Sequence, residues 1–156
     1  MSLERVREYL KEYHLDSKIR EFTVSSATVE LAAEAAGVIP ARIAKTLSFK
    51  TGETAVLVVA AGDARIDNKK YREQFGTKAK MLSPDEVIAY TGHAIGGVCP
   101  FDISDEMVKT YLDVSMKRFE TVFPAAGSDN SCVELTLDEL EKASKAVAWV
   151  DVTKLP

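Results

Sequence analysis

Lys45 is the first residue whose type and position suggest chemistry. It stands at the head of a strand-like stretch, residues Thr46–Lys50, directly after Ile43 and Ala44. A buried ammonium group is strongly disfavoured unless it meets an anion or hydrogen-bond acceptors. We therefore expect Lys45 to lie in the functional pocket and to bind a group of the ligand there. The alternative is a side chain that extends its charge into solvent at the end of a strand.

The glycine-rich segment Ile95–Phe101 is the second candidate. Gly96 and Gly97 have no side chains, and Pro100 stiffens the end of the segment. Consecutive backbone N–H groups in such a loop can bind a carbonyl, an oxyanion or a phosphate. The same residues also form ordinary tight turns, so this motif alone does not separate a ligand site from a turn.

Composition restricts the functions that these residues could serve. The chain has 156 residues, of which 46% are hydrophobic and 28% charged, which is typical of one globular domain spanning residues 1–156. Its net charge of −4 argues against a protein that grips long nucleic acid, and we expect no DNA partner. The longest apolar run, Ala55–Ala61, is too short to span a membrane, so we expect a cytoplasmic protein without a membrane partner.

Cysteine and histidine provide no further catalytic motif. Cys99 and Cys132 show neither CxxC spacing nor nearby histidines, so the sequence predicts no disulfide, no metal site and no cofactor. His93 could act as a base, although a structural role at a helix end is the better explanation, and His14 is expected at the surface. Cys99 is expected to be a small buried thiol.

Positive charge is concentrated between residues 65 and 80. Six basic residues stand there against two acidic ones, so this stretch could hold a phosphorylated end of a ligand or could be a solvated helix face. The six are Arg65, Lys69, Lys70, Arg72, Lys78 and Lys80.

The elements that must position these residues alternate irregularly. Helices are predicted from Ser2 to about Tyr13, over Val29–Ala36, Asn68–Phe75 and Pro84–Thr91, and after the capping box Thr136–Glu139, with a short helical segment over Pro40–Ala44. Strands are predicted over Ile19–Val24, Thr46–Lys50, Thr54–Ala60, Ala79–Leu82, Lys109–Asp113, Thr121–Pro124, Ser131–Leu135 and Ala146–Val150. This order lacks a steady βαβ repeat and predicts a mixed α+β fold, a distorted mixed sheet or partial barrel surrounded by helices.

Four blocks in this order resemble the YbaK/EbsC family, the free-standing relatives of the editing (INS) domain inserted in bacterial prolyl-tRNA synthetases. The blocks are Ala35–Leu47, Val56–Asp67, Ile95–Phe101, and Ala126–Ser128 with Val133–Thr136. The resemblance implies a mixed α/β domain with a distorted sheet that hydrolyses the ester of a wrongly charged tRNA. Its partner would be the acceptor end of the mischarged tRNA, and an aminoacyl-tRNA synthetase is a second partner that the resemblance leaves open.

The resemblance also implies roles for individual residues. Lys45 would contact the terminal adenosine or its phosphate, and the loop with Gly97 would hold the ester carbonyl. These two are the expected catalytic residues, and Arg65, Lys69 and Lys70 the expected tRNA contacts. The expected substrate-binding residues are Thr28, Thr46, Gly96, Val98, Pro100, Gly127, Ser128 and Asp129.

The chain departs from some relatives after Gly127. Those relatives carry a histidine in this segment, whereas residues 128–131 here are Ser, Asp, Asn and Ser. Asp129 could bind an amino group instead, or could be a solvated turn residue. Small polar residues at 23–28 would suit a small amino acid, although capping explains them equally well.

Three functions therefore compete at the sequence level. An aminoacyl-tRNA deacylase needs only a bound water, an oriented ester and amide donors, because the ester is already activated. A non-catalytic module that binds a tRNA or a synthetase is the alternative suggested by the missing histidine. A hydrolase of small activated esters is the third.

Overall fold

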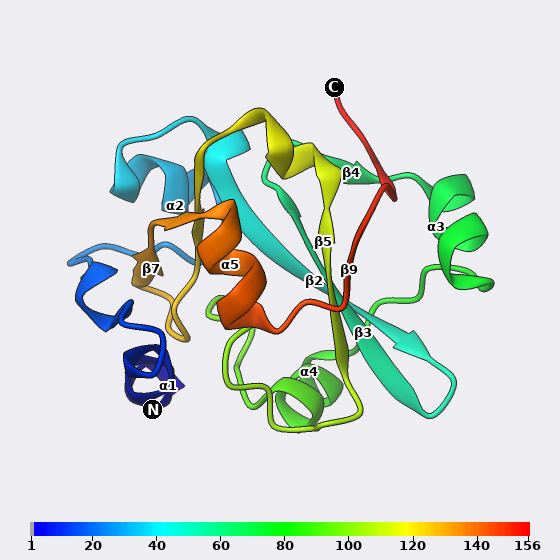
Figure 1. Ribbon diagram of the computed structural model, residues 1–156, viewed down its shortest axis with the longest axis horizontal. Helices are drawn as coiled ribbons and strands as arrows, with labels where there is room; N and C mark the ends of the chain where they lie inside the picture. Colours follow the sequence, from blue (N-terminus) through cyan, green and yellow to red (C-terminus); the bar gives the residue numbers. More distant parts are fainter. Residues whose placement is uncertain (1) are drawn as a thin grey trace.

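A six-stranded mixed sheet forms the centre of the computed structural model, which describes residues 2–156 (Figure 1). The strand order is β8-β6-β2-β3-β5-β9. The strands are β2 (Ile43–Thr51), β3 (Thr54–Ala61), β5 (Lys109–Asp113), β6 (Thr121–Pro124), β8 (Leu135–Thr136) and β9 (Ala148–Val150). The pairs β2/β3 and β6/β8 are antiparallel and the other three are parallel. The sheet curls into a half-barrel, which confirms the predicted mixed α+β fold.

Two short ladders and three 3₁₀ turns of the described residues lie around this sheet. Strand β1 (Ile19–Glu21) pairs with β7 (Ser131–Val133), and β4 (Arg65–Ile66) pairs with β10 (Thr153–Lys154). The turns span Asp16–Lys18, Pro40–Arg42 and Val114–Arg118. The β1/β7 ladder matters for the site because it holds the segment before α2 against the segment that follows Gly127.

Five helices within residues 2–156 surround the sheet, and four of them begin at a side-chain cap. They are α1 (Ser2–Lys11), α2 (Val29–Ala36), α3 (Asn68–Phe75), α4 (Pro84–Thr91) and α5 (Leu137–Ser144). The side chains of Thr28, Asp67, Ser83 and Thr136 accept hydrogen bonds from the first turns of α2, α3, α4 and α5. Both α4 and α5 have complete capping boxes.

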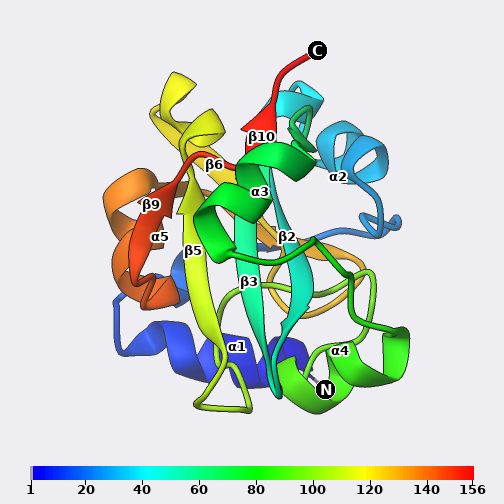
Figure 2. The ribbon, with the colours of Figure 1, turned by 90° about the vertical axis from the view of Figure 1, so that its right-hand side faces the viewer.

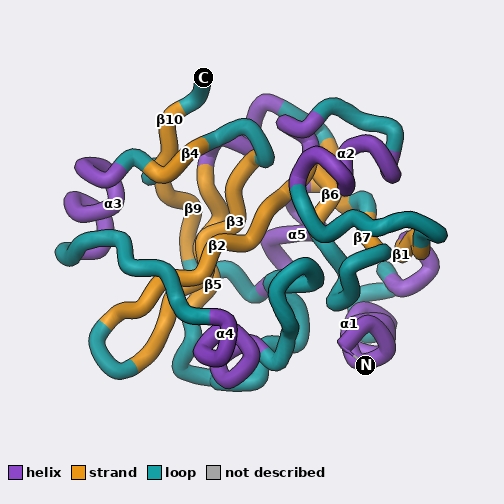
Figure 3. Tube along the Cα trace, turned by 180° about the vertical axis from the view of Figure 1, so that it is seen from behind, coloured by secondary structure: helices purple, strands orange, loops and turns teal. Residues whose placement is uncertain are grey.

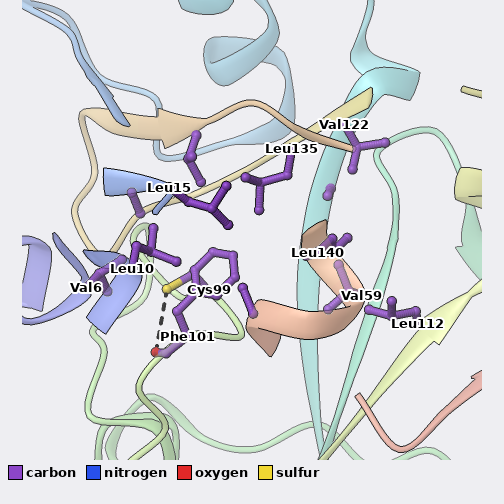
Figure 4. Packing of buried hydrophobic residues seen from close by; sticks show 14 of the residues in the cluster. Val6, Leu10, Leu15, Val59, Cys99, Phe101, Leu112, Val122, Leu135 and Leu140 are labelled. Carbon is purple, nitrogen blue, oxygen red and sulfur yellow. Dashed lines mark hydrogen bonds between the residues drawn. The ribbon is translucent and has the colours of Figure 1, made fainter. Parts of the chain in front are cut away.

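Helices cover the two faces of the sheet differently (Figures 1 and 2). Figure 2 shows α3 in front of the sheet, and Tyr71 of this helix packs with Phe49, Val56 and Val58. The larger core lies on the opposite face, where α1 and α5 pack their apolar residues against Val59 and Leu112 (Figure 4). Strand β3 is buried on both faces, as its continuous apolar run predicts.

The ends of several predicted elements are wrong. Helix α1 ends at Lys11 because the chain turns at His14, which has a positive φ of 61°. Strand β1 stops at Glu21, and the expected helical segment over Pro40–Ala44 is a 3₁₀ turn that ends at Arg42. Lys45, which was expected directly before the strand, is therefore the third residue of β2.

Three predicted strands differ from the structure because of their pairing partners. Residues 79–82 form no strand and make only a single bridge, between Met81 and Phe49. Residues 131–135 divide into β7 and β8 because the two halves pair with different strands, β1 and β6. The last predicted strand begins two residues late, at Ala148.

None of the helices within residues 2–156 has the length and apolar character needed to cross a bilayer.

Candidate functional site

A cavity of about 250 Å³ lies where the start of β2 meets α2 and the glycine-rich loop. Figure 3 shows α2, α4 and β7 around this part of β2. The cavity is lined by Ser26, Ala27, Thr28, Val29, Ala32, Ile43, Ala44, Lys45, Thr46, Ser48, Met81, Leu82, Val87, Ile95, Gly96, Val98, Phe123, Ala125, Ser131 and Cys132. Five of the expected site residues are thus brought together: Lys45, Thr46, Thr28, Gly96 and Val98.

Lys45 is half-buried in the cavity wall, and backbone carbonyls bind its ammonium group. Its Nζ donates a hydrogen bond to the carbonyl of Gly62 at 3.3 Å and another to the carbonyl of Ala64. An ammonium has three N–H donors, so one remains for a ligand. Burial lowers the pKa of Lys45, and the carboxylates of Asp63 and Glu30 partly oppose that shift.

The glycine-rich loop reaches the cavity through Gly96 and Val98 but not through Gly97. The N–H of Gly97 donates to the carbonyl of Ala94 at 3.0 Å, so this amide does not face a ligand as the sequence suggested. Within residues 2–156 we find no protein acceptor for the N–H of Gly96 or Val98. These two amides can therefore serve a bound carbonyl or oxyanion.

Gly97 has a packing role instead. A Cβ at this position would lie 2.8 Å from the backbone nitrogen of Ser128 and 2.9 Å from the carbonyl carbon of Gly127. Only a glycine allows the two loops to touch backbone to backbone. The contact fixes the position of Gly96, the next residue along the cavity wall.

The segment after Gly127 supports the cavity from behind. The hydroxyl of Ser128 hydrogen-bonds to the side chains of Asn130 and Ser131, and Asn130 Nδ2 donates to the carbonyl of Phe22. Asp129 is exposed, and its carbonyl accepts from the N–H of Ser26 at 2.6 Å. The expected substrate contacts Gly127, Ser128, Asp129 and Pro100 are not among the residues that line the cavity.

Two lining hydroxyls have no hydrogen-bond partner in the part of the chain that the structure describes. They belong to Ser26, which is 7% exposed, and to Thr46. A buried hydroxyl without a partner is uncommon in a folded protein, and a ligand is one explanation for it. Ser26 belongs to the small polar residues at 23–28 that were considered from the sequence for a small amino acid, whereas Ser48 was not assigned as a site residue from the sequence. The alternation of Ala44, Thr46 and Ser48 on one face of β2 was the signal that could have found Ser48.

The cavity contains no obvious general base. Its lining residues within 2–156 include no histidine and no carboxylate side chain. The one thiol there is Cys132, whose pKa burial raises to about 11. No group of three or more histidine, cysteine or acidic residues suited to a metal ion is found in the same described range. The geometry therefore favours a reaction in which the site orients a reactive substrate and a water.

Comparison with known proteins identifies the family of the chain that contains this cavity. Residues 23–143 match the model of the aminoacyl-tRNA editing domain family. This chain belongs to that family. The resemblance seen in the sequence is confirmed, and the cavity lies within the matched residues.

Relatives of this editing domain include proteins of similar length and parts of longer ones. The Bacillus subtilis protein YwhH, described as uncharacterized, is 56% identical over 155 residues, which cover 99% of this chain and 98% of that protein. The proline–tRNA ligase of Thermosipho melanesiensis is 29% identical over 150 residues, 92% of this chain but 26% of the ligase. That of Thermotoga maritima is 25% identical over 114 residues, 72% of this chain and 20% of the ligase.

Solved structures agree with this assignment. A crystal structure provisionally described as a trans-editing enzyme for prolyl-tRNA synthetase is 30% identical, with a TM-score of 0.87 over 98% of this chain and 97% of that one. The crystal structure of a hypothetical protein is 27% identical, with a TM-score of 0.84 over 96% of this chain and 99% of that one. These matches support an editing function at the level of the family.

His93 and Cys99 of the editing domain form part of its framework. His93 is fully buried, with Nδ1 2.7 Å from the hydroxyl of Ser2 and Nε2 2.7 Å from the carbonyl of Phe101. Burial lowers the pKa of His93 and raises that of Cys99 to about 12. Neither lines the cavity. The prediction of a small buried thiol at Cys99 is confirmed.

The basic residues divide into two groups on the surface. Arg65 is exposed and lies close enough to Lys45 to contribute to the lowering of its pKa. Lys69 lies farther along, where it lines a second, open cavity with Arg72 and Lys78. Lys70, which is also expected to contact tRNA, donates to Asp151 at 3.0 Å and to the carbonyl of Thr153 at 2.9 Å.

Proposed function

We propose that this editing domain hydrolyses the ester bond of a mischarged aminoacyl-tRNA. One observation carries the proposal. Lys45, Gly96 and Val98 line one small cavity although Lys45 is far from the other two in the sequence, and the amides of Gly96 and Val98 have no protein acceptor within residues 2–156. A positive charge and free amides in a partly buried cavity suit an ester carbonyl that becomes negatively charged during hydrolysis.

The reaction needs no nucleophile from the protein. Water adds to the acyl carbon, the carbon–oxygen bond to the ribose breaks, and the ribose oxygen leaves with a proton. The products are the free amino acid and the uncharged tRNA. The amides of Gly96 and Val98 stabilise the oxyanion, and the remaining N–H of Lys45 binds the ribose or phosphate end of the ester.

The size of the cavity limits the substrate. Its volume of about 250 Å³ is below the range of roughly 300–1,000 Å³ that is usual for drug-sized ligands. It accommodates the aminoacyl ester and leaves the remainder of the nucleotide outside. The inner wall is largely apolar, with Val29, Ala32, Ile43 and Phe123. A small amino acid therefore fits best.

The identity of the tRNA is proposed from the relatives. Because proline–tRNA ligases contain a similar segment, we place the mischarged amino acid on tRNA-Pro or a related tRNA. The acceptor end would pass Arg65 on its way to the cavity, and its backbone would meet Lys69, Arg72 and Lys78. A synthetase that presents its mischarged product to this domain is a compatible partner.

Deacylation of mischarged tRNA by the purified protein is the test. Alanyl, cysteinyl, seryl and threonyl esters on tRNA-Pro would be compared for wild type, Lys45→Met and Lys50→Met. Lys50 is the matched control, since it lies on the same strand and pairs with Glu86 away from the cavity. We expect Lys45→Met to lower the rate about 10²-fold and Lys50→Met to leave it unchanged.

Two results would contradict the proposal. If wild type binds charged tRNA without releasing the amino acid, the chain is a binding module. If it cleaves simple amino-acid esters faster than charged tRNA, it is an esterase for small substrates.

A further inference from the structure

Strand β2 loses its neighbour on one side where it passes the cavity. On that side β6 pairs only with Ile43 and Ala44. The next contact comes four residues later, where Ser48 accepts from the N–H of Leu82 at 3.2 Å, and the N–H of Lys50 donates to Lys80 at 2.8 Å. Thr46 lies in the gap, and the gap opens into the cavity.

The register of the β2/β3 hairpin shows which way the Thr46 backbone points. Thr51 pairs with Thr54 across a two-residue turn, and the pairing continues without a bulge to Ala44 and Ala61. In an antiparallel ladder alternate residues exchange hydrogen bonds with the partner strand, and the others point away from it. Ser48 and Lys50 point away from β3, as their bonds to residues 80–82 show, so Thr46 does too.

Thr46 therefore presents a backbone N–H and a backbone C=O to the cavity. Neither is hydrogen-bonded to another residue in the range 2–156. The hydroxyl of Thr46 and that of Ser26 are unpartnered as well. Buried polar groups without partners destabilise a fold, and two such hydroxyls beside two unpaired backbone groups at one cavity point to a ligand that satisfies them.

We propose that the open edge of β2 at Thr46 binds the aminoacyl group as though it were one residue of an added strand. In an antiparallel pair two opposed residues exchange both of their hydrogen bonds. The N–H of Thr46 donates to the acyl carbonyl, and the carbonyl of Thr46 accepts from the α-ammonium group. The hydroxyl of Ser26 is a second acceptor for the ammonium.

This arrangement rests on the proposed function and adds recognition of the α-amino group to it. The acyl oxygen has two lone pairs, so it can accept from Thr46 and from the Gly96 or Val98 amide at the same time. The substrate is then an α-amino acid ester. An otherwise identical hydroxy-acid ester can replace the two charge-assisted bonds to the Thr46 carbonyl and to Ser26 by at most one neutral bond.

Two stable ligands test the idea directly. They are 3′-alanylamino-3′-deoxyadenosine and its lactoyl counterpart, which has a hydroxyl in place of the α-ammonium. Amide hydrogen exchange would be followed for Thr46 and for Lys45 and Leu47, whose backbone groups face β3. In the free protein we expect Thr46 to exchange much faster than its two neighbours. The alanyl ligand should slow the exchange of Thr46 at least tenfold and bind at least tenfold tighter than the lactoyl ligand.

Side-chain variants complete the test. Ser26→Ala should weaken binding of the alanyl ligand more than that of the lactoyl ligand, because the lactoyl hydroxyl has a single neutral donor and the Thr46 carbonyl competes for it. Thr54→Val is the matched control, since its hydroxyl is also buried, has no partner among the described residues and lies outside the cavity. It should change neither affinity.

Several results would overturn this inference. A Thr46 amide that already exchanges slowly in the free protein would mean that the edge is not open. If the two ligands bind with equal affinity, or if Thr46 remains unprotected in the alanyl complex, the added-strand arrangement is wrong. Continued deacylation of charged tRNA would then show that the proposed function still holds. If the wild-type protein neither bound the alanyl ligand nor deacylated charged tRNA, the proposed function itself would be refuted.

Discussion

Replacing Gly97 with alanine tests whether contact between the two glycine loops holds the site in place. The new Cβ would lie 2.8–2.9 Å from backbone atoms of Gly127 and Ser128. Backbone atoms cannot rotate away, so the loops must separate by about half an ångström to restore ordinary contact. Overpacking of this kind destabilises a protein by about 1–3 kcal/mol, which is less than a typical folding free energy of about 5–15 kcal/mol. The Gly97→Ala protein should therefore fold.

Its activity should fall more than its stability. Gly96 follows the displaced loop, and a shift of about 1 Å in a catalytic group can lower a rate about 10²-fold. For half that shift we expect roughly a tenfold loss in kcat/KM for deacylation. The control is Gly52→Ala at the tip of the β2/β3 hairpin, where φ is +57° and nothing lies near the new Cβ.

Urea unfolding and deacylation would be measured on both variants. Gly52→Ala should also lose about 1–2 kcal/mol, because an alanine is strained in the left-handed region, but it should keep the wild-type rate. The reasoning is refuted if Gly97→Ala retains full activity, or if Gly52→Ala loses as much activity for the same loss of stability.

Three further predictions concern the framework and the surface. Because burial raises the pKa of Cys99 to about 12 and that of Cys132 to about 11, both thiols should react with a disulfide reagent at pH 8 only after unfolding; rapid labelling of the native protein would contradict this. Burial lowers the pKa of His93, so the unfolded chain binds the proton more tightly; the free energy of unfolding should decrease as the pH falls below about 6.5, and His93→Gln should flatten that dependence in a urea titration. Lys69→Glu combined with Arg72→Glu should raise KM for charged tRNA and reduce its salt dependence, but leave cleavage of an aminoacyl-adenosine unchanged; equal loss on both substrates would place the effect in the cavity instead.

Local signals in the sequence were sufficient for much of the fold. The caps at Thr28, Asp67, Ser83 and Thr136 are short-range patterns, and α2, α3 and α4 have the predicted bounds. Strand ends depend on partners distant in the chain. No local pattern reveals that residues 131–135 divide between two partner strands, or that residues 79–82 make only one bridge.

The sequence predicted the candidate site only in outline, because the contacts that complete the site also join residues distant in the chain. The four blocks located Lys45 and the glycine-rich loop, which do meet at one cavity. The partner of each amide could not be read from the sequence, so Gly97 was assigned to the ligand although its N–H binds Ala94. The unpaired position of Thr46 arises because β6 pairs with β2 only at Ile43 and Ala44, which is a property of the sheet and not of the residues around Thr46.

A crystal structure with bound 3′-alanylamino-3′-deoxyadenosine would examine the central claim most directly. The account predicts the alanyl group inside the cavity between Lys45 and Gly96, with the adenosine outside its mouth. An alanyl group bound elsewhere, for example at the surface of α3 around Lys69, would contradict the claim that this cavity holds the ester.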